Sequence, residues 1–529
     1  MTIEEIPFIR VPQFSDRDKA YTLRDPKLDP FYKYPVTLEA FEQVIEDKAK
    51  DPTPRDLLVK VLKAQYETLG SSPEVMRNIE ALQAPNTFTV VTAHQPVLFT
   101  GPLYFVYKIA STIHLARSIQ ARYPKVKVVP VMIMGGEDHD FEEANHAHIF
   151  GRKLVWENEA GGSVGRMDTR SLSAVLEELL GMLGESDHAR EMEKHLTEAF
   201  KGHERYGRAM QHFVNGFFKR YGLIVLSMDH PDLKRHFIPH MRRELLEQPS
   251  QDLVTGTQSD LEKEGFSAQA FARPINLFYL TGQSRERIEE TEGVYQLTES
   301  EKTFSKEEIL AEMEQHPERF SPNVVMRPLY QEALLPNLAY IGGGGELAYW
   351  LERKKQFAYF GINFPMLIRR NSVLWLDKNA RKKMDKLGVE LKDMLGDTEA
   401  LVKEWVHARS EQELSLDEER AALQKIFDRI AQRAQAIDPT LVKTAKAEGA
   451  KQSKGLDQLE GKLIRAQKQR FDIELNQLRS LKDKLFPGGG LQERHDNFIP
   501  FFLKHGADYF EILIDHLDPL KTDFVVIHG

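Results

Sequence analysis

Five short apolar runs lie in the middle of the chain, at residues 88–93, 126–134, 223–226, 338–341 and 364–368. Runs of this length, bounded by polar or glycine-rich residues, are typical of buried β-strands. The second run contains Pro130, which fits best near a strand edge or a bulge because proline has no N–H for the strand ladder. The pattern therefore predicts five strands.

Helical patterns separate these runs. Apolar residues recur at helical spacing over 102–121, around 213–220 and from 346 to about 359. Strands that alternate with helices predict an α/β fold with a parallel, doubly wound sheet, whose ligands bind beyond the carboxyl ends of the strands. More than 100 residues separate the third run from the fourth. This is too many for a simple crossover, so we expect an inserted subdomain at about 230–330.

The segment from 373 to 486 has a different character. It is rich in Glu, Lys, Arg, Gln, Leu and Ala, and its apolar residues recur mainly in steps of three and four. They are Leu423, Ile426, Ile430, Ile437 and Leu441, and then Leu456, Leu459, Leu463 and Ala466. Such spacing predicts two α-helices in a coiled coil. The segment 448–455 is expected to let them fold back antiparallel, and Pro487–Gly490 to end the second.

These patterns give a plan of the domains. We expect a helical N-terminal segment at 1–85, an α/β core at 86–372, a coiled-coil domain at 373–490 and an aromatic tail at 491–529 that packs back on the core. A chain of 529 residues exceeds what one hydrophobic core usually covers, which agrees with several units.

Composition narrows the class of function. A net charge of −9 and a pI near 6.1 give no electrostatic reason to expect binding to nucleic acid or to a membrane surface. The absence of cysteine excludes disulfides, thiolate metal sites and a cysteine nucleophile. The first residues lack the basic and apolar segments of a signal peptide, and no apolar run reaches 18 residues, so we expect a cytoplasmic protein.

The first candidate site follows the run at 88–93. His94, Gln95, Thr100 and Gly101 lie between a predicted strand and the start of a helix, where backbone N–H groups and the helix dipole attract a phosphate or a carboxylate. Lys108, one to two turns into the helix, is expected to neutralise the same anion. The structural alternative is that Thr100 caps the helix and His94 satisfies buried backbone groups.

The second candidate site follows the run at 126–134. Residues 137–146 contain five carboxylates and two histidines. Clustered carboxylates raise one another's pKa, which favours a general base, and a histidine beside them can shuttle a proton. The candidate catalytic residues are Asp138, His139 and Asp140. Glu142 and His146 would share a helix face suited to a divalent metal, although Glu142 and Glu143 are more simply explained as a solvated first helical turn.

The third candidate site follows the run at 338–341. Gly342, Gly343, Gly344 and Gly345 precede Glu346, and such a run permits close approach of a phosphate to the backbone. It lacks the Gly-Lys-Ser or Gly-Lys-Thr of a P-loop and the spaced glycines of a dinucleotide fingerprint, so a tight structural turn is the alternative. Arg327, and Arg369 with Arg370 and Asn371, are candidates to bind a substrate carboxylate or phosphate, or else to form interdomain salt bridges.

Several motifs together resemble the bacillithiol biosynthesis cysteine-adding (BshC) enzymes. They are Thr100-Gly-Pro-Leu-Tyr104 with Lys108, Glu137-Asp-His-Asp140, Asn276-Leu-Phe-Tyr279, His316-Pro-Glu-Arg-Phe-Ser-Pro-Asn-Val-Val-Met-Arg-Pro328, and Leu335 to Glu346 with Tyr349-Trp350. These motifs span most of residues 90–375. Many members of the family have Gln-Gln-x-Gly where this chain has His94-Gln-Pro-Val97, so the family assigns no role to His94.

The resemblance implies a Rossmann-like core with connecting-peptide insertions, a coiled coil that forms a homodimer, and Asn276 among the binding residues. The implied reaction joins L-cysteine to glucosaminyl-malate by an amide bond, the last step of bacillithiol biosynthesis. Because a carboxylate does not acylate an amine unaided, we expect ATP as a co-substrate, with Mg²⁺ possible and no prosthetic group or protein-held metal site. An adenylate is the first intermediate to test. The alternatives are a related amino-acid ligase with a different amine acceptor and a non-enzymatic coiled-coil scaffold.

Overall fold

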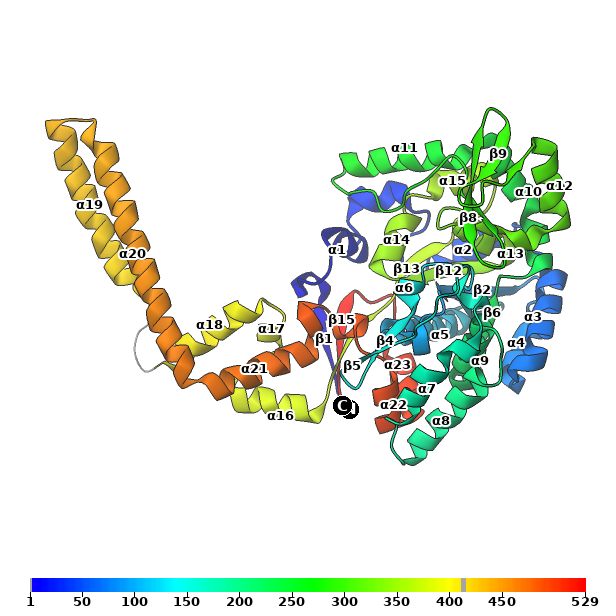
Figure 1. The fold of residues 1–529 in the computed structure, drawn as a ribbon, viewed down its shortest axis with the longest axis horizontal. Helices are drawn as coiled ribbons and strands as arrows, with labels where there is room; N and C mark the ends of the chain where they lie inside the picture. The colour runs from blue at the N-terminus through cyan, green and yellow to red at the C-terminus, as the bar shows by residue number, and fades with distance from the viewer. Residues whose placement is uncertain (1, 411–414) are drawn as a thin grey trace. The chain divides into compact units, whose positions relative to one another are not determined.

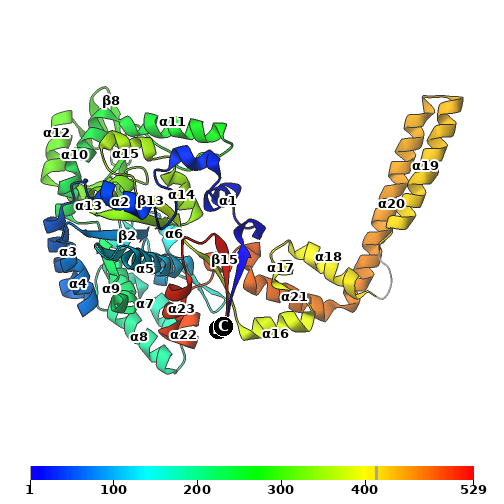
Figure 2. The ribbon, with the colours of Figure 1, turned by 180° about the vertical axis from the view of Figure 1, so that it is seen from behind.

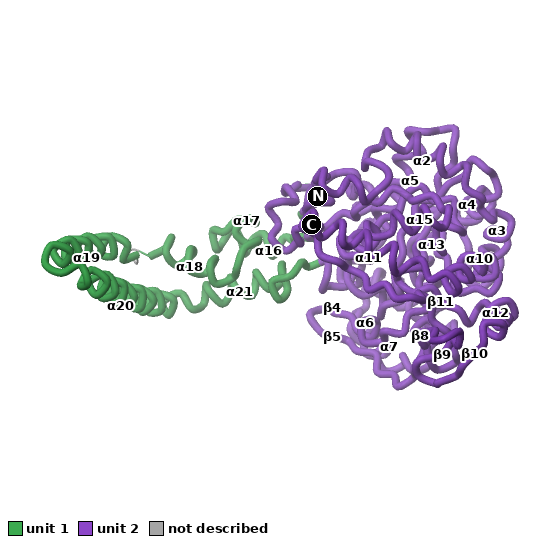
Figure 3. The backbone as a smooth tube through the Cα atoms, turned by 90° about the horizontal axis from the view of Figure 1, so that it is seen from above, with its two compact units in different colours: residues 1–2, 375–492, 527–529 green, residues 3–374, 493–526 purple. Residues whose placement is uncertain are grey.

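The structure is a computed structural model that describes residues 2–410 and 415–529. It divides into two compact units, which Figure 3 colours separately. The core unit comprises residues 3–374 and 493–526, and the helical unit comprises residues 375–492 with a few residues from each end of the chain. The chain therefore leaves the core unit for the helical unit and then returns to it.

A five-stranded parallel sheet forms the centre of the core unit (Figure 1). Its strands, in spatial order, are β13 (Met366–Arg369), β12 (Asn337–Gly342), β2 (Thr87–His94), β3 (Lys127–Met134) and β6 (Ile224–Ser227). The predicted fold class and all five predicted strands are confirmed. Strand β6 pairs with β3 only from Val131 onward, so Pro130 lies just before that ladder begins and its missing N–H is tolerated.

Helices cover both faces of this sheet, as can be followed from the front and from behind in Figures 1 and 2. On one face, Val90 and Val128 pack with residues of α2 (Phe41–Lys48) and α5 (Tyr104–Arg122). On the other, Val91 and Val129 pack with residues of α3 (Arg55–Leu69), α4 (Pro73–Ala81), α10 (Pro231–Glu247) and α13 (Arg327–Leu334). Neighbouring residues of each strand thus face opposite layers, which explains why the strands are apolar throughout.

Further helices of the core unit lie outside the long connection between β6 and β12. They are α1 (Asp16–Thr22), α3 (Arg55–Leu69), α4 (Pro73–Ala81), α7 (Ser173–Leu180), α8 (Asp187–Phe200), α9 (Tyr206–Phe218), α14 (Gly344–Trp350), α15 (Lys354–Phe360), α22 (Ile499–His505) and α23 (Asp508–His516). The single helix predicted over 346–359 is wrong, because the chain breaks between α14 and α15. At the break, the buried Glu352 carboxylate accepts hydrogen bonds from the backbone N–H groups of Gln269, at 2.6 Å, and Ala270, at 3.3 Å.

An antiparallel sheet occupies the long connection between β6 and β12. Its strands, in spatial order, are β10 (Thr303–Phe304), β9 (Val294–Leu297), β8 (Arg285–Thr291), β7 (Leu277–Leu280) and β11 (Phe320–Pro322). Its helices are α10 (Pro231–Glu247), α11 (Pro249–Lys263), α12 (Lys306–Gln315) and α13 (Arg327–Leu334). These elements place residues 230–330 beside the carboxyl edge of the parallel sheet.

Smaller sheets were not predicted. Helix α6 covers only Phe141–Ala144, and a hairpin of β4 (His146–Ile149) and β5 (Arg152–Val155) follows it. Glu142 and His146 therefore do not share a helix, so the predicted spacing for a divalent metal is wrong.

A further sheet has the order β1 (Thr2–Pro7), β15 (Asp523–His528) and β14 (Ser372–Leu376). In the tail, the Ile514 carbonyl contacts His114 Nδ1 of α5 at 2.8 Å.

The helical unit contains a long antiparallel pair of helices (Figure 1). Its helices are α16 (Lys378–Leu387), α17 (Leu391–Met394), α18 (Thr398–Arg409), α19 (Asp417–Ile437), α20 (Leu441–Arg470) and α21 (Asp472–Leu485). The predicted turn at 448–455 is wrong, since the chain reverses between Ile437 and Leu441. There, Asp438 Oδ1 accepts the Thr440 N–H at 2.9 Å. Gly449 lies inside α20, where a Cβ would stand 2.9 Å from Phe427 Cγ, so this glycine brings the two helices together.

Candidate active site

A cleft of about 970 Å³ opens at the carboxyl edge of the parallel sheet, between the strand ends and the inserted subdomain. This volume falls within the range of small-molecule sites in proteins. The predicted site residues that line it are His94, Gln95, Asp138, Arg327, Gly343, Gly345 and Glu346. The predicted residues that are not part of its lining are Thr100, Gly101, Lys108, His139, Asp140, Asn276, Gly342, Gly344, Arg369 and Asn371.

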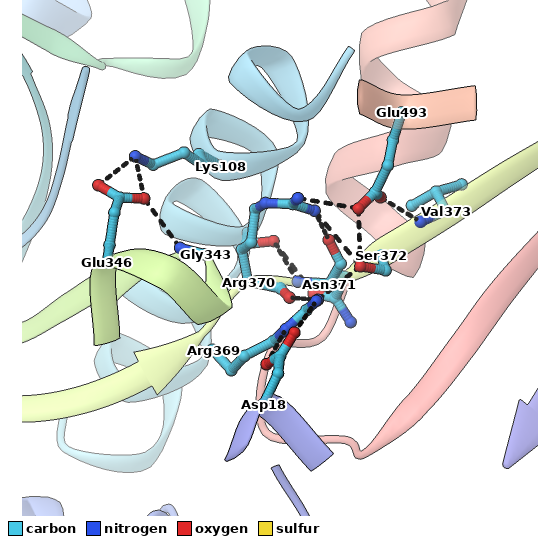
Figure 4. A network of polar contacts seen from close by, with 11 residues as sticks. Asp18, Lys108, Gly343, Glu346, Arg369, Arg370, Asn371, Ser372, Val373 and Glu493 are labelled. Carbon is cyan, nitrogen blue, oxygen red and sulfur yellow. Dashed lines mark hydrogen bonds and ion pairs between the residues drawn. The ribbon is translucent and has the colours of Figure 1, made fainter. Parts of the chain in front are cut away.

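Glu346 is the centre of one polar network in the cleft wall (Figure 4). Its carboxylate oxygens lie 2.8 and 2.7 Å from Nζ of the buried Lys108, which also contacts the Ala93 carbonyl. The Tyr340 hydroxyl and the Gly343 N–H donate to the same carboxylate at 2.8 and 2.9 Å. Burial opposes ionisation, but Lys108 and the Gly343 N–H lower the pKa of Glu346 to about 2. Lys108 thus neutralises Glu346, and a bound anion would compete with that carboxylate.

The glycine run is occupied by contacts within the protein. A Cβ on Gly344 would stand 2.3 Å from Cγ of Asp18, so this glycine makes room for a carboxylate from α1. Asp18 in turn lies 3.1 Å from Arg369 Nη2. Because Glu346 accepts the Gly343 N–H, the geometry supports a tight structural turn, and not a phosphate-binding loop, for much of this segment.

Residues 369–371 are buried, and Figure 4 shows their polar contacts with neighbouring segments. Arg369 pairs with Asp18. Asn371 contacts Ser111 Oγ at 3.0 Å and donates to the Asp518 carbonyl at 2.8 Å. Arg370, which does line the cleft, pairs with Glu493 at 2.8 Å. Arg369 and Asn371 therefore connect segments of the core unit.

Arg327 keeps its guanidinium at the cleft. Its Nη2 donates to the Tyr349 hydroxyl at 2.7 Å, and both residues line the cavity. Among the described residues, none places a carboxylate within ion-pair distance of Arg327. This arginine is therefore available to an anionic ligand.

His94 is held as a neutral imidazole. Its Nδ1 lies 2.9 Å from the Gln95 carbonyl oxygen, to which it donates. Burial, with help from the nearby Lys108 ammonium, lowers the pKa of His94 to about 4. The predicted contact with backbone is present, and it leaves Nε2 as an acceptor in the cleft wall.

The loop before α5 is strained and clamped. Phe99, Thr100 and Gly101 have φ values of 49°, 74° and 61°, a left-handed conformation that is costly for the first two residues. Asn497 Nδ2 donates to the Phe99 and Gly101 carbonyls at 2.8 and 2.7 Å. Thr100 does not cap α5, whose N-cap is Leu103 without a side-chain hydrogen bond. The capping alternative for Thr100 is wrong.

The Asp138 carboxylate is stabilised in its ionised form. Its Oδ1 accepts the His139 N–H at 2.8 Å and lies 3.5 Å from Arg285 Nη1. Burial raises the pKa of Asp138, but His139 and Arg285 outweigh it and bring the value to about 2. Asp138 is therefore not a carboxylate of the cluster with a raised pKa. Asp140 caps α6, accepting the Glu143 N–H at 3.2 Å.

Sequence reasoning missed a buried charge network beside Asp138. Lys234 of α10, whose side chain is fully buried, forms an ion pair with Glu137 and lies 3.5 Å from Asp229. Arg166 donates to Asp229 at 2.7 and 2.8 Å. Burial raises the pKa of Glu137, and Asp229 adds to this shift while Lys234 opposes it. Two sequence signals point to this network: Glu137 belongs to the carboxylate cluster after the run at 126–134, and Asp229 follows the run at 223–226.

Asn276 lies outside the lining of the cleft, whereas a group of histidines lies within it. The buried Asn276 donates to Glu244 Oε1 at 2.8 Å and to the Arg273 carbonyl at 2.6 Å, so it shapes a loop of the inserted subdomain. His146 and His148 of β4, with Arg494 and His495, also line the cleft. Of this group, the sequence pointed only to His146, through its place in the cluster at 137–146. Within the described residues, no cluster of three or more His, Asp or Glu side chains has the geometry of a metal site.

The two-unit fold, with a cleft beyond parallel strands and a long helical hairpin, defines a Rossmann-like protein that carries a coiled coil. Residues 1–371 match the family model described as "Bacillithiol biosynthesis BshC, N-terminal Rossmann-like domain", and residues 373–529 match "Bacillithiol biosynthesis BshC, C-terminal coiled-coil domain". The chain belongs to the bacillithiol biosynthesis BshC family.

Similar proteins cover nearly the whole chain. The "Putative cysteine ligase BshC" of Flavobacterium johnsoniae is 41% identical over 97% of both chains. The protein of the same name from Christiangramia forsetii is 39% identical over 96% of this chain and 95% of its own. That of Bacillus cytotoxicus is 29% identical over 93% and 94%. No helix in the described part of the chain is long and apolar enough to cross a membrane.

Proposed function

We propose that this protein is a cysteine ligase that joins L-cysteine to glucosaminyl-malate by an amide bond, in the last step of bacillithiol biosynthesis. Family membership over the full length and the name of its relatives support this function. One structural observation supports this function in particular: the carboxylates of Glu137 and Asp138 and the available guanidinium of Arg327 line the same cleft. With ATP as co-substrate, the reaction belongs in the cytoplasm.

The chemistry requires an activated carboxyl group. In the proposed route, a carboxylate oxygen of cysteine attacks the α-phosphorus of ATP, the bond to pyrophosphate breaks, and cysteinyl adenylate forms. The amine nitrogen of glucosaminyl-malate then attacks the carbonyl carbon, the bond to AMP breaks, and the nitrogen loses a proton. Arg327 is suited to hold a phosphate or carboxylate oxygen, because guanidinium groups bind such oxygens in pairs.

The acidic side of the cleft is suited to the amine. An ammonium must lose a proton before it attacks a carbonyl carbon. Burial raises the pKa of Glu137, which favours proton uptake by this carboxylate. Asp138 stays ionised and can orient the positively charged amine. Mg²⁺ bound to ATP needs only one or two protein carboxylates beside its phosphate ligands, and Asp138 fits that role.

Isotope exchange tests the proposed activation. An adenylate route predicts that the protein exchanges labelled pyrophosphate into ATP only when cysteine is present. An acyl-phosphate route instead predicts release of ADP that depends on both substrates. If neither nucleotide reaction depends on cysteine, ATP does not activate the carboxyl group.

We further propose that the hairpin of α19 and α20 forms a homodimer. Within these two helices, as far as they are described, only Ala431 and Gly449 are buried. The apolar seam is largely exposed, with 43% of Ile426, 42% of Ile430, 49% of Leu459 and 39% of Leu463 accessible to solvent. A seam of this kind is normally covered by another helix of a coiled coil. A second copy supplies that cover with twofold symmetry.

A further inference from the structure

The segment 493–497, which follows the helical unit in sequence, is built into the cleft wall. The Leu103 N–H donates to the Asp496 carbonyl at 2.7 Å, and the Asn497 N–H donates to the His148 carbonyl at 3.0 Å. The Asn497 side chain clamps the strained loop before α5. Backbone and side-chain bonds on both sides therefore fix the position of Arg494 and His495.

Arg494 brings an uncompensated positive charge to this wall. It is exposed and lines the cleft, and within the described chain it has no hydrogen bond or ion pair with another residue. The neighbouring Glu493 carboxylate is already used by Arg370, at 2.8 Å, and by the Val373 N–H, at 2.8 Å (Figure 4). Asp18 is likewise held by Arg369. The nearby carboxylates are thus committed elsewhere, and the Arg494 guanidinium is left for a ligand.

Two imidazoles lie beside this arginine in the wall. The rings of His148 and His495 stack with centroids 4.0 Å apart and an angle of 26° between their planes. His495 Nδ1 is 2.8 Å from Asp496 Oδ1, which orients its ring. Burial, together with the neighbouring His495 and His146, lowers the pKa of His148 to about 4, so this ring is neutral near pH 7. A neutral imidazole can donate one N–H to an oxyanion without repelling the ring stacked on it.

Five acidic residues of the described chain line the cleft. Glu346 is paired with Lys108, and Glu143 of α6 accepts a hydrogen bond from Gln95 Nε2 at 2.9 Å. Glu137, Asp138 and Asp229 follow β3 and β6, and each has a cationic partner among Lys234, Arg285 and Arg166. Arg494 and the two histidines come from the returning segment and from β4. The cleft therefore offers one ligand an acidic group after β3 and β6 and a basic group from the returning segment and β4. A ligand with an amine and a carboxylate at different places is matched by this arrangement.

We infer that Arg494, with His148 and His495, forms an oxyanion subsite that holds the malyl carboxylates of the amine substrate. This inference rests on the proposed function and adds the orientation of the amine substrate in the cleft. The malyl carboxylates anchor the substrate at the subsite, and its amine faces the acidic residues. Guanidinium and imidazole N–H groups also suit a phosphate of ATP. The two sources of oxyanion are distinguished by measuring the ligands separately.

Calorimetric titration of the full-length protein tests the subsite. The ligands are glucosaminyl-malate, a methyl glucosaminide that lacks the malyl group, L-malate and ATP, each without cysteine. Arg494→Gln is expected to weaken binding of glucosaminyl-malate and L-malate by at least about tenfold, the usual effect of losing a charge-assisted hydrogen bond. Binding of methyl glucosaminide and ATP should not change, and Arg494→Lys should recover part of the loss.

The matched control is Arg190→Gln on α8, an exposed arginine paired with Asp187. It should bind every ligand as the wild-type protein does, and equal melting temperatures should show that all variants are folded. Selective loss of ATP binding by Arg494→Gln would give the subsite to a phosphate and overturn the carboxylate assignment. Unchanged binding of all ligands would overturn the subsite. Failure of the wild-type protein to bind glucosaminyl-malate would count against the proposed function, and L-malate would still test Arg494.

Discussion

The ammonium of Lys108 lies 2.7 Å from a carboxylate oxygen of Glu346. The pair joins α5, which follows β2, to α14, which follows β12, at the wall of the cleft. The lysine side chain is 1% exposed and the glutamate side chain 26% exposed, so water screens the pair little. These two residues hold two strand-end loops together, and they bring no net charge to the cleft.

Removing one member of this pair should destabilise the protein strongly. Lys108→Met leaves the Glu346 carboxylate without its cation, and breaking a mostly buried pair costs about 3 kcal/mol. Lys108→Met combined with Glu346→Gln should lose less than the sum of the single losses, because no lone charge remains. Urea unfolding measures these free energies. Lys60→Met is the control, since Lys60 is 74% exposed and 3.4 Å from Asp232. Equal losses in the two lysine variants would contradict the role of the pair.

The strand-end loop at Asp138 should affect turnover more than stability. Asp138→Asn removes the charge that Arg285 faces in the cleft, and His139→Ala removes the side chain beside it. Each is expected to lower turnover at least about tenfold with little change in melting temperature, because loops at strand ends are placed for ligands. Glu142→Gln, one turn further on, serves as the control. Normal activity combined with a lower melting temperature would show that the cluster is structural.

Stability should fall as pH drops from about 6.5 toward 4. Burial is the main cause of a pKa of about 4 for His94, His148, His195, His203 and His240. In the unfolded chain their pKa is about 6.5. Between these values the unfolded state binds more protons, so the free energy of unfolding decreases as pH falls. Asp138 and Glu346, with pKa values of about 2, lose their contribution only at lower pH.

Urea unfolding at pH 7.5, 6.5 and 5.5 measures this effect. The free energy of unfolding should change less with pH in His195→Gln, because the variant has no imidazole to titrate at this position. In the wild-type protein this ring packs on Phe217, with ring centroids 4.4 Å apart. Replacing the exposed Gln452 by His serves as a control that should leave this pH dependence unchanged. A free energy of unfolding that stays constant over this range would contradict the burial of these imidazoles.

The hairpin should determine the oligomeric state. The double substitution Leu459→Lys with Leu463→Lys places two charges in the exposed apolar seam. Light scattering should then show a monomer. Gln452→Lys with Gln458→Lys adds the same charge at exposed polar positions and should leave a dimer. Deleting residues 411–486 is a less specific test, because it also removes Leu475 and Leu478 of α21, which are buried in the helical unit. A dimer that survives in the leucine variant would move the interface away from the hairpin.

The parallel sheet was predictable because its strands are buried on both faces. Val90 and Val91 point to opposite helical layers, so the strand is apolar at every position and is visible in the sequence. The turn of the helical hairpin was misplaced for a local reason. The composition of the segment 448–455 is typical of a helix break, but its Gly449 faces Phe427 inside α20, and this contact depends on a residue 22 positions earlier.

Most of the cleft residues that the sequence predicts follow a strand, and Arg327, at the start of α13, is the exception. His94, Asp138 and Glu346 lie at strand ends, and the rule for parallel sheets places them in one cleft. Lys234 and Arg494 lie on a helix and on a returning segment, and no local pattern marks them. The partners of Lys108 and Arg369 were also hidden, because Glu346 and Asp18 approach them only in the folded chain.

Mass spectrometry of the reaction products tests the central claim most directly. The purified protein is incubated with glucosaminyl-malate, cysteine and ATP, with serine in place of cysteine as the parallel reaction and Asp138→Asn as the control protein. The proposed function predicts a product heavier than glucosaminyl-malate by one cysteine residue, formed poorly with serine and at least about tenfold more slowly by the variant, as expected for a ligand-facing loop. No such product, or equal products from serine and cysteine, would contradict it.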